Sequence, residues 1–243
     1  MTDPSFGMLL QHALVLLLAI GMPLWDRYEI PRLKASTEPR KKVKYYWRVS
    51  ILLWVLAVVC VLAIGLVAAV TIQSSHEVSW LEPGAHGRVF LEGLTAGILI
   101  VVFLPAILAV RSEKIRAKAG KAARKRLAFL LPSTPEERAW WWLVCLSAGS
   151  CEEIVYRGFL LHYFHFSPFH LTWVWALVAS AAIFGVGHLY QGIAGAVQTM
   201  VLGFIFGAIF LMTGTLLLPM VLHALLDLRA LAILPVGFDQ AEA

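Results

Sequence analysis

The chain has 243 residues, of which 60% are hydrophobic and only 14% are charged, with a mean hydropathy of +0.77 and a formal net charge of +5. Soluble globular domains carry about 25% charged residues, so this composition excludes an ordinary soluble domain and indicates a polytopic membrane protein. We expect an all-α transmembrane bundle of about seven spans, because helices satisfy their own backbone hydrogen bonds in lipid.

The first part of the chain alternates apolar runs with basic segments. Apolar runs long enough to span a bilayer are predicted at roughly residues 7–25, 49–71 and 89–110. They are separated by a basic loop, a polar connection and a second basic loop, at residues 26–48, 72–88 and 111–126. These segments are expected to form an N-terminal unit of three spans over residues 1–130.

The placement of the basic residues predicts the topology. Cytoplasmic loops of membrane proteins are enriched in Lys and Arg, so both basic loops and the C-terminus are expected in the cytoplasm, and the N-terminus outside. We expect a multi-pass protein of the bacterial inner membrane. The basic charge is interpreted as a solvated face that contacts lipid headgroups. No nucleic-acid partner is expected, because no binding module is present.

The second part of the chain begins with a helix start. The sequence LPSTPEER at residues 131–138 places Pro135 at an early helical position and Glu136 and Glu137 in the first turn, where both residue types are favoured. Tryptophans at 140–142 are expected to form an interfacial belt. A core of four spans is predicted over residues 131–243, at roughly 140–163, 171–190, 193–212 and 216–234.

The span at 140–163 carries three charged residues in its middle: Glu152, Glu153 and Arg157. A charge at the bilayer centre costs roughly 2.5–3.5 kcal/mol, so these side chains are expected to face a polar cavity inside the bundle. On an α-helix, Glu153 and Arg157 share a face and can pair. Glu152 points about 100° away and is left as a free carboxylate.

Two later spans also place ionisable residues in their interior. Phe184 and His188 are four residues apart, and so are His223 and Asp227. A buried carboxylate can take a proton from water, an imidazole can hold that water, and a second imidazole can stabilise an oxyanion. This set favours peptide-bond hydrolysis by activated water. A zinc site formed by Glu152, His188 and His223 is the alternative, although the spacing is not HExxH.

The ordered motifs resemble a known family. They are Glu152-Glu153-xxx-Arg157, Phe184-xxx-His188 and His223-xxx-Asp227, with the lead-in LPSTPEERAWW and the continuation YRGFL. Over about residues 131–234 the chain resembles the CPBP family, which comprises the CAAX prenyl protease type II-like and the bacteriocin-processing (Abi) intramembrane proteases. The first three spans match no family that we can name.

The resemblance implies a role for each motif residue. Glu152 would be the general base that activates water, and His188 would hold that water. His223 would stabilise the tetrahedral oxyanion. Family members carry Asn or Asp at the position of Asp227, and an acid is a poorer oxyanion donor unless it is protonated, so we expect Asp227 to orient His223.

The remaining motif residues are expected to support the site. Glu153 and Arg157 would form a structural pair, and Phe184 would serve in packing. The family has been described both as metalloproteases and as glutamate-type proteases. We favour the glutamate type and leave the metal open, with zinc as a candidate and no cofactor certain.

The predicted function is that of an intramembrane endopeptidase acting on a membrane-associated protein or peptide. The substrate could carry a prenylated CAAX-type tail, a leader or a membrane anchor, and the lipid bilayer is the second expected partner. Two alternatives stay open: a non-catalytic scaffold or immunity protein of the same fold, and a proton-coupled transporter, since chains of Glu and His line such paths.

Overall fold

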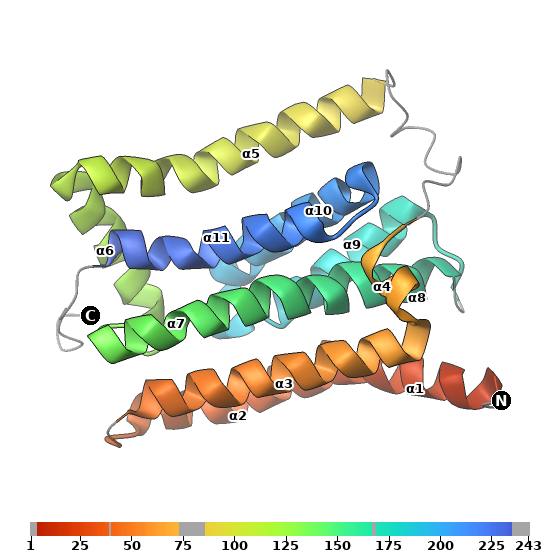
Figure 1. Cartoon of the computed structure of the whole chain (residues 1–243), viewed down its shortest axis with the longest axis horizontal. Helices are drawn as coiled ribbons and strands as arrows, with labels where there is room; N and C mark the ends of the chain where they lie inside the picture. The colour runs from red at the N-terminus through yellow and green to blue at the C-terminus, as the bar shows by residue number, and fades with distance from the viewer. Residues whose placement is uncertain (1–3, 39, 73–85, 167–168, 235–243) are drawn as a thin grey trace.

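A computed structural model of the chain describes residues 4–38, 40–72, 86–166 and 169–234. These residues form a bundle of helices that run nearly side by side (Figure 1). Within the described ranges there is no β-strand, and only an isolated bridge joins Thr71 to Thr215. The expected all-α class is therefore confirmed.

The first helices run along one side of the bundle. They are α1 (Pro4–Leu16), the π-helical turn η1 (Leu17–Gly21), α2 (Met22–Ala35), α3 (Lys41–Ile64) and the short α4 (Leu66–Val70). The predicted loop at 26–48 is wrong over most of its length, because α2 continues to Ala35 and α3 already begins at Lys41. Arg32 and Lys34 lie in the last turn of α2, where the helix dipole favours cations.

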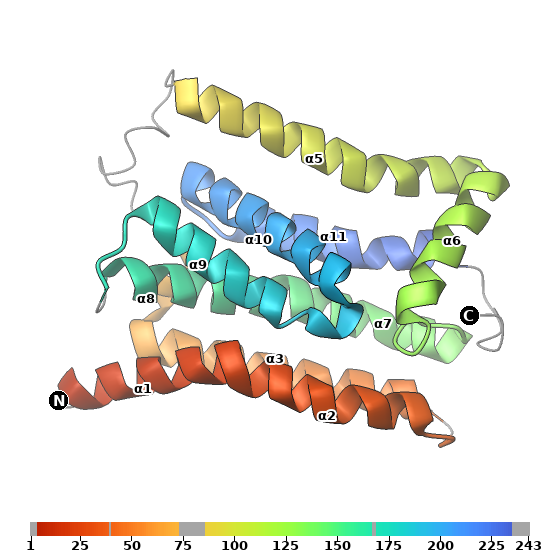
Figure 2. The ribbon, with the colours of Figure 1, turned by 180° about the vertical axis from the view of Figure 1, so that it is seen from behind.

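The second predicted basic loop is also helical. After α5 (His86–Arg111), the chain forms α6 (Glu113–Leu127), which crosses the end of the bundle from α5 toward α7 (Figures 1 and 2). The side chain of Ser112 caps α6 by accepting a hydrogen bond from the backbone of Ile115, and basic residues fill the last turn. The Ser112 cap and the helix dipole stabilise α6. The number of charges alone had indicated a loop.

The second half of the chain supplies the centre of the bundle. It consists of α7 (Pro135–Ser147), π-helical η3 (Ala148–Leu160), α8 (Leu161–Phe166), α9 (Trp173–Val186), the 3₁₀ turn η4 (Leu189–Gln191), α10 (Ile193–Thr213) and α11 (Leu217–Ile233). The predicted helix start is confirmed, because Thr134 and Glu137 form a reciprocal capping box at the start of α7. α11 packs against η3, α7, α5 and α10.

The outer surface of the bundle is apolar. Four helical stretches are long and apolar enough to cross a membrane: Gly7–Ala35, Lys41–Ile64, His86–Arg111 and Ile193–Thr213. α9 is a shorter apolar helix. Large side chains such as Leu62, Phe90 and Ile193 are more than two-thirds exposed, as is expected of a surface that faces lipid. The chain is therefore a membrane protein, whereas the count of seven spans stays a prediction.

Buried contacts join the N-terminal helices to the second half. Nζ of Lys42 on α3 donates to the carbonyl oxygen of Leu131 at 2.5 Å and lies 3.7 Å from the carboxylate of Glu137. The hydroxyl of Tyr46 donates to the carbonyl oxygen of Leu130, also at 2.5 Å. The contacts of Lys42 cross the boundary predicted at residue 130, and the bond of Tyr46 ends at the boundary residue itself. The division into two units stays a prediction.

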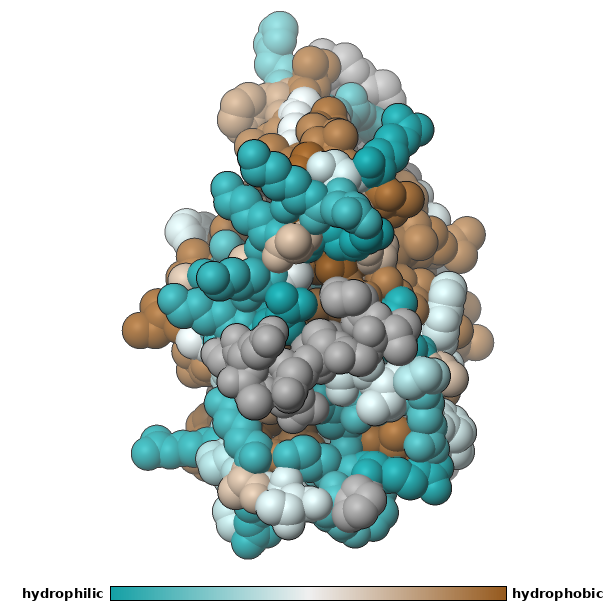
Figure 3. All heavy atoms as spheres, turned by 90° about the vertical axis from the view of Figure 1, so that its left-hand side faces the viewer, coloured by the Kyte–Doolittle hydropathy of each residue, from teal (hydrophilic) through white to brown (hydrophobic). Residues whose placement is uncertain are grey.

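Both basic segments lie at the same end of the bundle. The turn between α2 and α3, helix α6 and the start of α7 meet there, and α1 begins at the opposite end (Figure 1). Figure 3 shows hydrophilic side chains gathered over this end. The two basic segments therefore share one side of the bundle, and the side of the membrane that this end occupies stays a prediction.

A cysteine-labelling scan tests this topology. Cysteines placed at exposed positions of residues 41–44 and 118–125, namely Lys44, Lys118 and Lys125, are expected to react only from the cytoplasmic side. Cysteines at 74–79, outside the described residues, are expected to react only from the other side. If both basic segments were labelled from outside the cell, the predicted orientation would be reversed.

Candidate active site

The charged residues of η3 form a buried pair. Glu153 and Arg157 are at most 1% exposed, and Nη1 of Arg157 lies 3.0 Å from Oε1 of Glu153. This is the pairing that their spacing predicts. The guanidinium also sits over the ring of Phe184, with 4.1 Å between its carbon and the ring centroid. An ion pair and a cation–π contact therefore hold Arg157 between η3 and α9.

His223 on α11 joins the same pair. Its Nδ1 lies 2.7 Å from Oε1 of Glu153. Since the carboxylate that pairs with Arg157 can only accept, the ring nitrogen is the donor. The expectation that Asp227 orients His223 is wrong in this respect. Oδ2 of Asp227 lies 3.7 Å from Nε2 of His223, too far for a hydrogen bond, and Glu153 makes the orienting bond instead.

Both glutamates approach His223. Oε2 of Glu152 lies 3.8 Å from Nε2 of His223, while Glu153 contacts the other ring nitrogen. An α-helix would separate the two carboxylates by about 100°, but residues 148–160 are π-helical. The wider π turn, with its i→i+5 hydrogen bonds, reduces the angle between successive side chains. Two adjacent glutamates can therefore reach one imidazole.

His188 follows the last residues of α9. Its Nδ1 lies 2.8 Å from the carbonyl oxygen of Phe184. A carbonyl can only accept, so Nδ1 carries the hydrogen, and Nε2 remains available to another partner. The ring of Phe184 makes edge contacts with His188 and His223, at centroid distances of 4.6 and 6.1 Å. Phe184 thus packs between the two histidines, as expected, and its backbone also orients His188.

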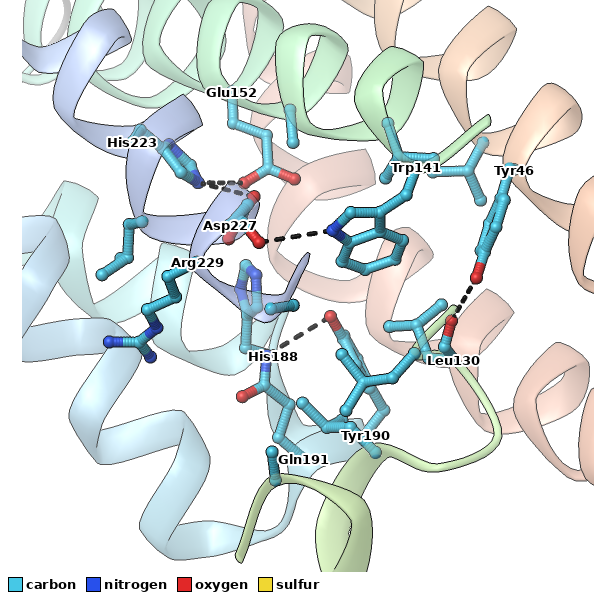
Figure 4. Close-up of a pocket in the computed structure, with 18 of the residues that line it drawn as sticks. Tyr46, Leu130, Trp141, Glu152, His188, Tyr190, Gln191, His223, Asp227 and Arg229 are labelled. Atoms are coloured by element: carbon cyan, nitrogen blue, oxygen red, sulfur yellow. Dashed lines mark hydrogen bonds and ion pairs between the residues drawn. The ribbon is translucent and has the colours of Figure 1, made fainter. Parts of the chain in front are cut away.

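The predicted catalytic residues line one cavity of about 220 Å³ (Figure 4). They come from three elements: η3, the end of α9 and α11. In Figure 4, Glu152 and Asp227 approach the same side of the His223 ring. Most other walls are apolar. Sequence reasoning missed several further lining residues, among them Tyr45, Tyr190, Gln191 and Arg229.

The missed residues differ in how readily the sequence alone could have identified them. Arg229 lies two residues after Asp227 on α11, inside a predicted span, and the rule that singled out the other charges should have found it. Trp141 was expected in an interfacial belt and is instead buried. Its Nε1 donates to the carbonyl oxygen of Asp227 at 3.3 Å. Trp142 next to it is 52% exposed, and a role at the membrane interface stays a prediction for it.

The proposed zinc ligands do not assemble as a metal centre. Across the described ranges, no group of three His, Cys, Asp or Glu side chains is placed to hold a metal ion. Nδ1 of His223 is engaged by Glu153 and Nδ1 of His188 by a backbone carbonyl, which leaves Nε2 as the only ring atom of each histidine that could bind a metal. Because Glu152, His188 and His223 are not gathered into such a group, we derive no step through a metal.

A glycine allows α11 to approach η3 closely. A Cβ atom on Gly149 would lie 2.8 Å from both the backbone nitrogen and Cβ of Ala224, next to His223. Backbone atoms cannot move aside as a flexible side chain does, so Gly149→Ala must separate the two helices. Such overpacking costs typically 1–3 kcal/mol.

We expect Gly149→Ala to lower the free energy of unfolding by about this amount and to reduce any peptide cleavage, because Glu152 and His223 move apart. Thermal unfolding in detergent measures the first effect. Gly97→Ala is the matched control, since nothing lies within 4 Å of its added Cβ atom. Equal melting temperatures for the two variants would contradict the prediction.

Comparison with known families agrees with the motifs. No curated protein and no solved structure matches the chain. A family model described as type II CAAX prenyl endopeptidase Rce1-like matches residues 134–229. This stretch runs from the cap of α7 into α11 and includes every motif residue described above. The resemblance is thereby confirmed: over residues 134–229, the chain matches the Rce1-like family of type II CAAX prenyl endopeptidases.

Proposed function

We propose that this protein is an intramembrane endopeptidase that hydrolyses a peptide bond of a membrane-associated substrate with a water molecule activated by Glu152. The matched family is one of peptidases. The observation that carries the proposal is the environment of Oε2 of Glu152. That atom is buried, accepts no hydrogen bond from the described residues and belongs to the wall of the cavity. A carboxylate oxygen in such a place needs a donor that comes from outside the protein.

Water is the donor that fits the neighbouring groups. Nε2 of His188 is the free acceptor of a neutral imidazole, because Nδ1 is committed to the carbonyl oxygen of Phe184. A water molecule between the two residues can donate one hydrogen to Glu152 and the other to His188. Its lone pair is then directed at the carbonyl carbon of a bound peptide, and Glu152 takes the proton as the C–O bond forms.

His223 is placed to stabilise the oxyanion. Its Nδ1–H donates to Glu153, which fixes the plane of the ring, and Nε2 faces the cavity within 3.8 Å of Glu152. In the imidazolium form, Nε2–H can donate to the oxyanion of the tetrahedral intermediate. Glu152 then returns its proton to the leaving amine, so that one amide bond is exchanged for a carboxylate and an amine.

Purified protein in lipid nanodiscs provides the test. It would be incubated with a farnesylated peptide ending in a CAAX tail, a leader-type peptide and a transmembrane-anchor peptide, and the products identified by mass spectrometry. We expect cleavage of at least one peptide at a single bond, and none by Glu152→Ala. Absence of cleavage for all three, or equal cleavage by the variant, would contradict the proposal.

A further inference from the structure

A second chamber of about 80 Å³ adjoins the cavity described above. It shares Glu152, His188 and Tyr190 with that cavity, so the two spaces meet at the proposed catalytic residues. Its other walls come largely from α2 and α3, which lie outside the stretch matched by the family model. The first helices of the chain therefore build part of the surroundings of the site.

Asp26 is the charged residue that α2 contributes to this chamber. Its side chain is half-buried, and no hydrogen bond or ion pair joins it to the residues that the structure describes. Glu29, one turn further along the same helix, is paired with Arg48. A carboxylate held against apolar side chains without a partner is costly. Asp26 thus offers an acceptor for a group that enters the chamber.

The other walls indicate what that group is. Trp25 stacks on Tyr45, with ring centroids 6.5 Å apart and an interplanar angle of 10°. Tyr156 and Tyr190 also line the chamber, together with aliphatic residues of α3. Aromatic faces and a carboxylate attract a cation, and aliphatic walls suit a methylene stem. A slender cationic side chain meets both requirements.

We propose that this chamber is a subsite for a lysine side chain of the substrate next to the cleaved bond, and that Asp26 is the residue that determines this specificity. The inference rests on the proposed function for the identity of the substrate. One water needs roughly 10–15 Å³ on a comparable measure, so the chamber holds several waters, or a slender stem with an ammonium group that displaces them. Arginine, with its broad planar head, is the poorer fit.

A binding experiment tests the chamber without relying on proteolysis. n-Butylammonium chloride reproduces the lysine side chain, 1-butanol is its neutral analogue, and sodium chloride controls for ionic strength. At concentrations about tenfold above its dissociation constant, butylammonium is expected to raise the melting temperature of the wild-type protein by a few degrees. Butanol and sodium chloride are expected to produce no such rise.

Two variants of residues on α2 test whether Asp26 is responsible for this rise in melting temperature. Asp26→Asn is expected to remove the rise caused by butylammonium. Glu29→Gln, a matched loss of one carboxylate outside the chamber, is expected to retain it. No rise in the wild-type protein, or an equal rise in Asp26→Asn, would overturn the assignment whether or not the protein cleaves peptides.

Cleavage kinetics then test specificity. In whichever probe peptide is cut, lysine and the uncharged isostere norleucine would be compared at each of the two positions on either side of the cut. For one position, kcat/KM in the wild-type protein is expected to be about tenfold higher with lysine than with norleucine, as a desolvated cation–π contact allows. In Asp26→Asn the ratio is expected to fall to about one. A wild-type enzyme without this preference contradicts the lysine subsite and leaves the proteolytic function intact. Absence of cleavage contradicts the proteolytic function. The butylammonium experiment shows separately whether the chamber binds a cation of this kind.

Discussion

Replacing Glu152 with glutamine is expected to reduce turnover by about 10²–10⁴-fold while the protein folds normally. Glutamine preserves the shape of the side chain, and Oε2 of Glu152 makes no hydrogen bond with the described residues that the substitution could break. A carboxamide cannot take the proton of a water molecule, however. The variant therefore removes the proposed base and little else.

Turnover and stability are measured on the same preparations, by peptide cleavage and by thermal unfolding in detergent. Glu136→Gln is a suitable control, because that glutamate lies at the exposed start of α7 and contacts Arg40. It is expected to retain turnover. If Glu152→Gln still cleaves, or melts as early as the variants of Glu153 described next, then another group carries out the chemistry.

Replacing Glu153 with glutamine is expected to destabilise the protein. Arg157 would be left as a buried charge without its counter-ion, and removal of one partner from a buried pair costs roughly 3–5 kcal/mol. The same oxygen of Glu153 holds His223, so turnover should fall as well. Loss of both properties distinguishes this glutamate from its neighbour, Glu152.

The double variant separates the two roles of Glu153. Arg157→Leu alone is expected to resemble Glu153→Gln in stability, because it removes the counter-ion of the carboxylate and leaves that group with only the hydrogen bond from His223. In the combination of both substitutions no buried charge is stranded, and part of the lost stability should return. Turnover is expected to stay low, since the hydrogen bond to His223 is then to a neutral amide. A double variant no more stable than either single variant would show that the pair is not the source of the loss.

Local patterns predicted the parts of this structure that depend on neighbouring residues. Thr134 and Glu137 form the cap that their spacing indicates, and Glu153 and Arg157 pair at the expected interval. The two basic segments were taken for loops because they are not apolar. Hydropathy does not separate a polar helix from a loop. The Ser112 cap of α6 and the basic last turns of α2 and α6 favour the helical state.

Contacts between helices that are distant in the sequence could not be predicted from the sequence alone. The bond from His223 to Glu153 joins two helices across 70 residues of sequence, and no residue pattern indicates that Glu153 lies in a π-helix. Asp26 was assigned to the start of a loop, and its place in the same chamber as Glu152 follows from the packing of α2 on the later helices. Chemistry could be inferred from residue types, but the partner of each group required the three-dimensional arrangement.

The position of His223 has a consequence for synthesis of the protein. α11 is the last helix of the described chain, and Glu153 lies 70 residues before its histidine partner. A ribosome therefore delivers both glutamates to the membrane well before the imidazole that they flank. Until α11 inserts and docks, the nascent chain has a carboxylate facing the space that the helix will fill and no oxyanion donor from it. Under the proposed mechanism, hydrolytic competence arises only after α11 has inserted, so the helices made before it cannot hydrolyse a peptide bond on their own.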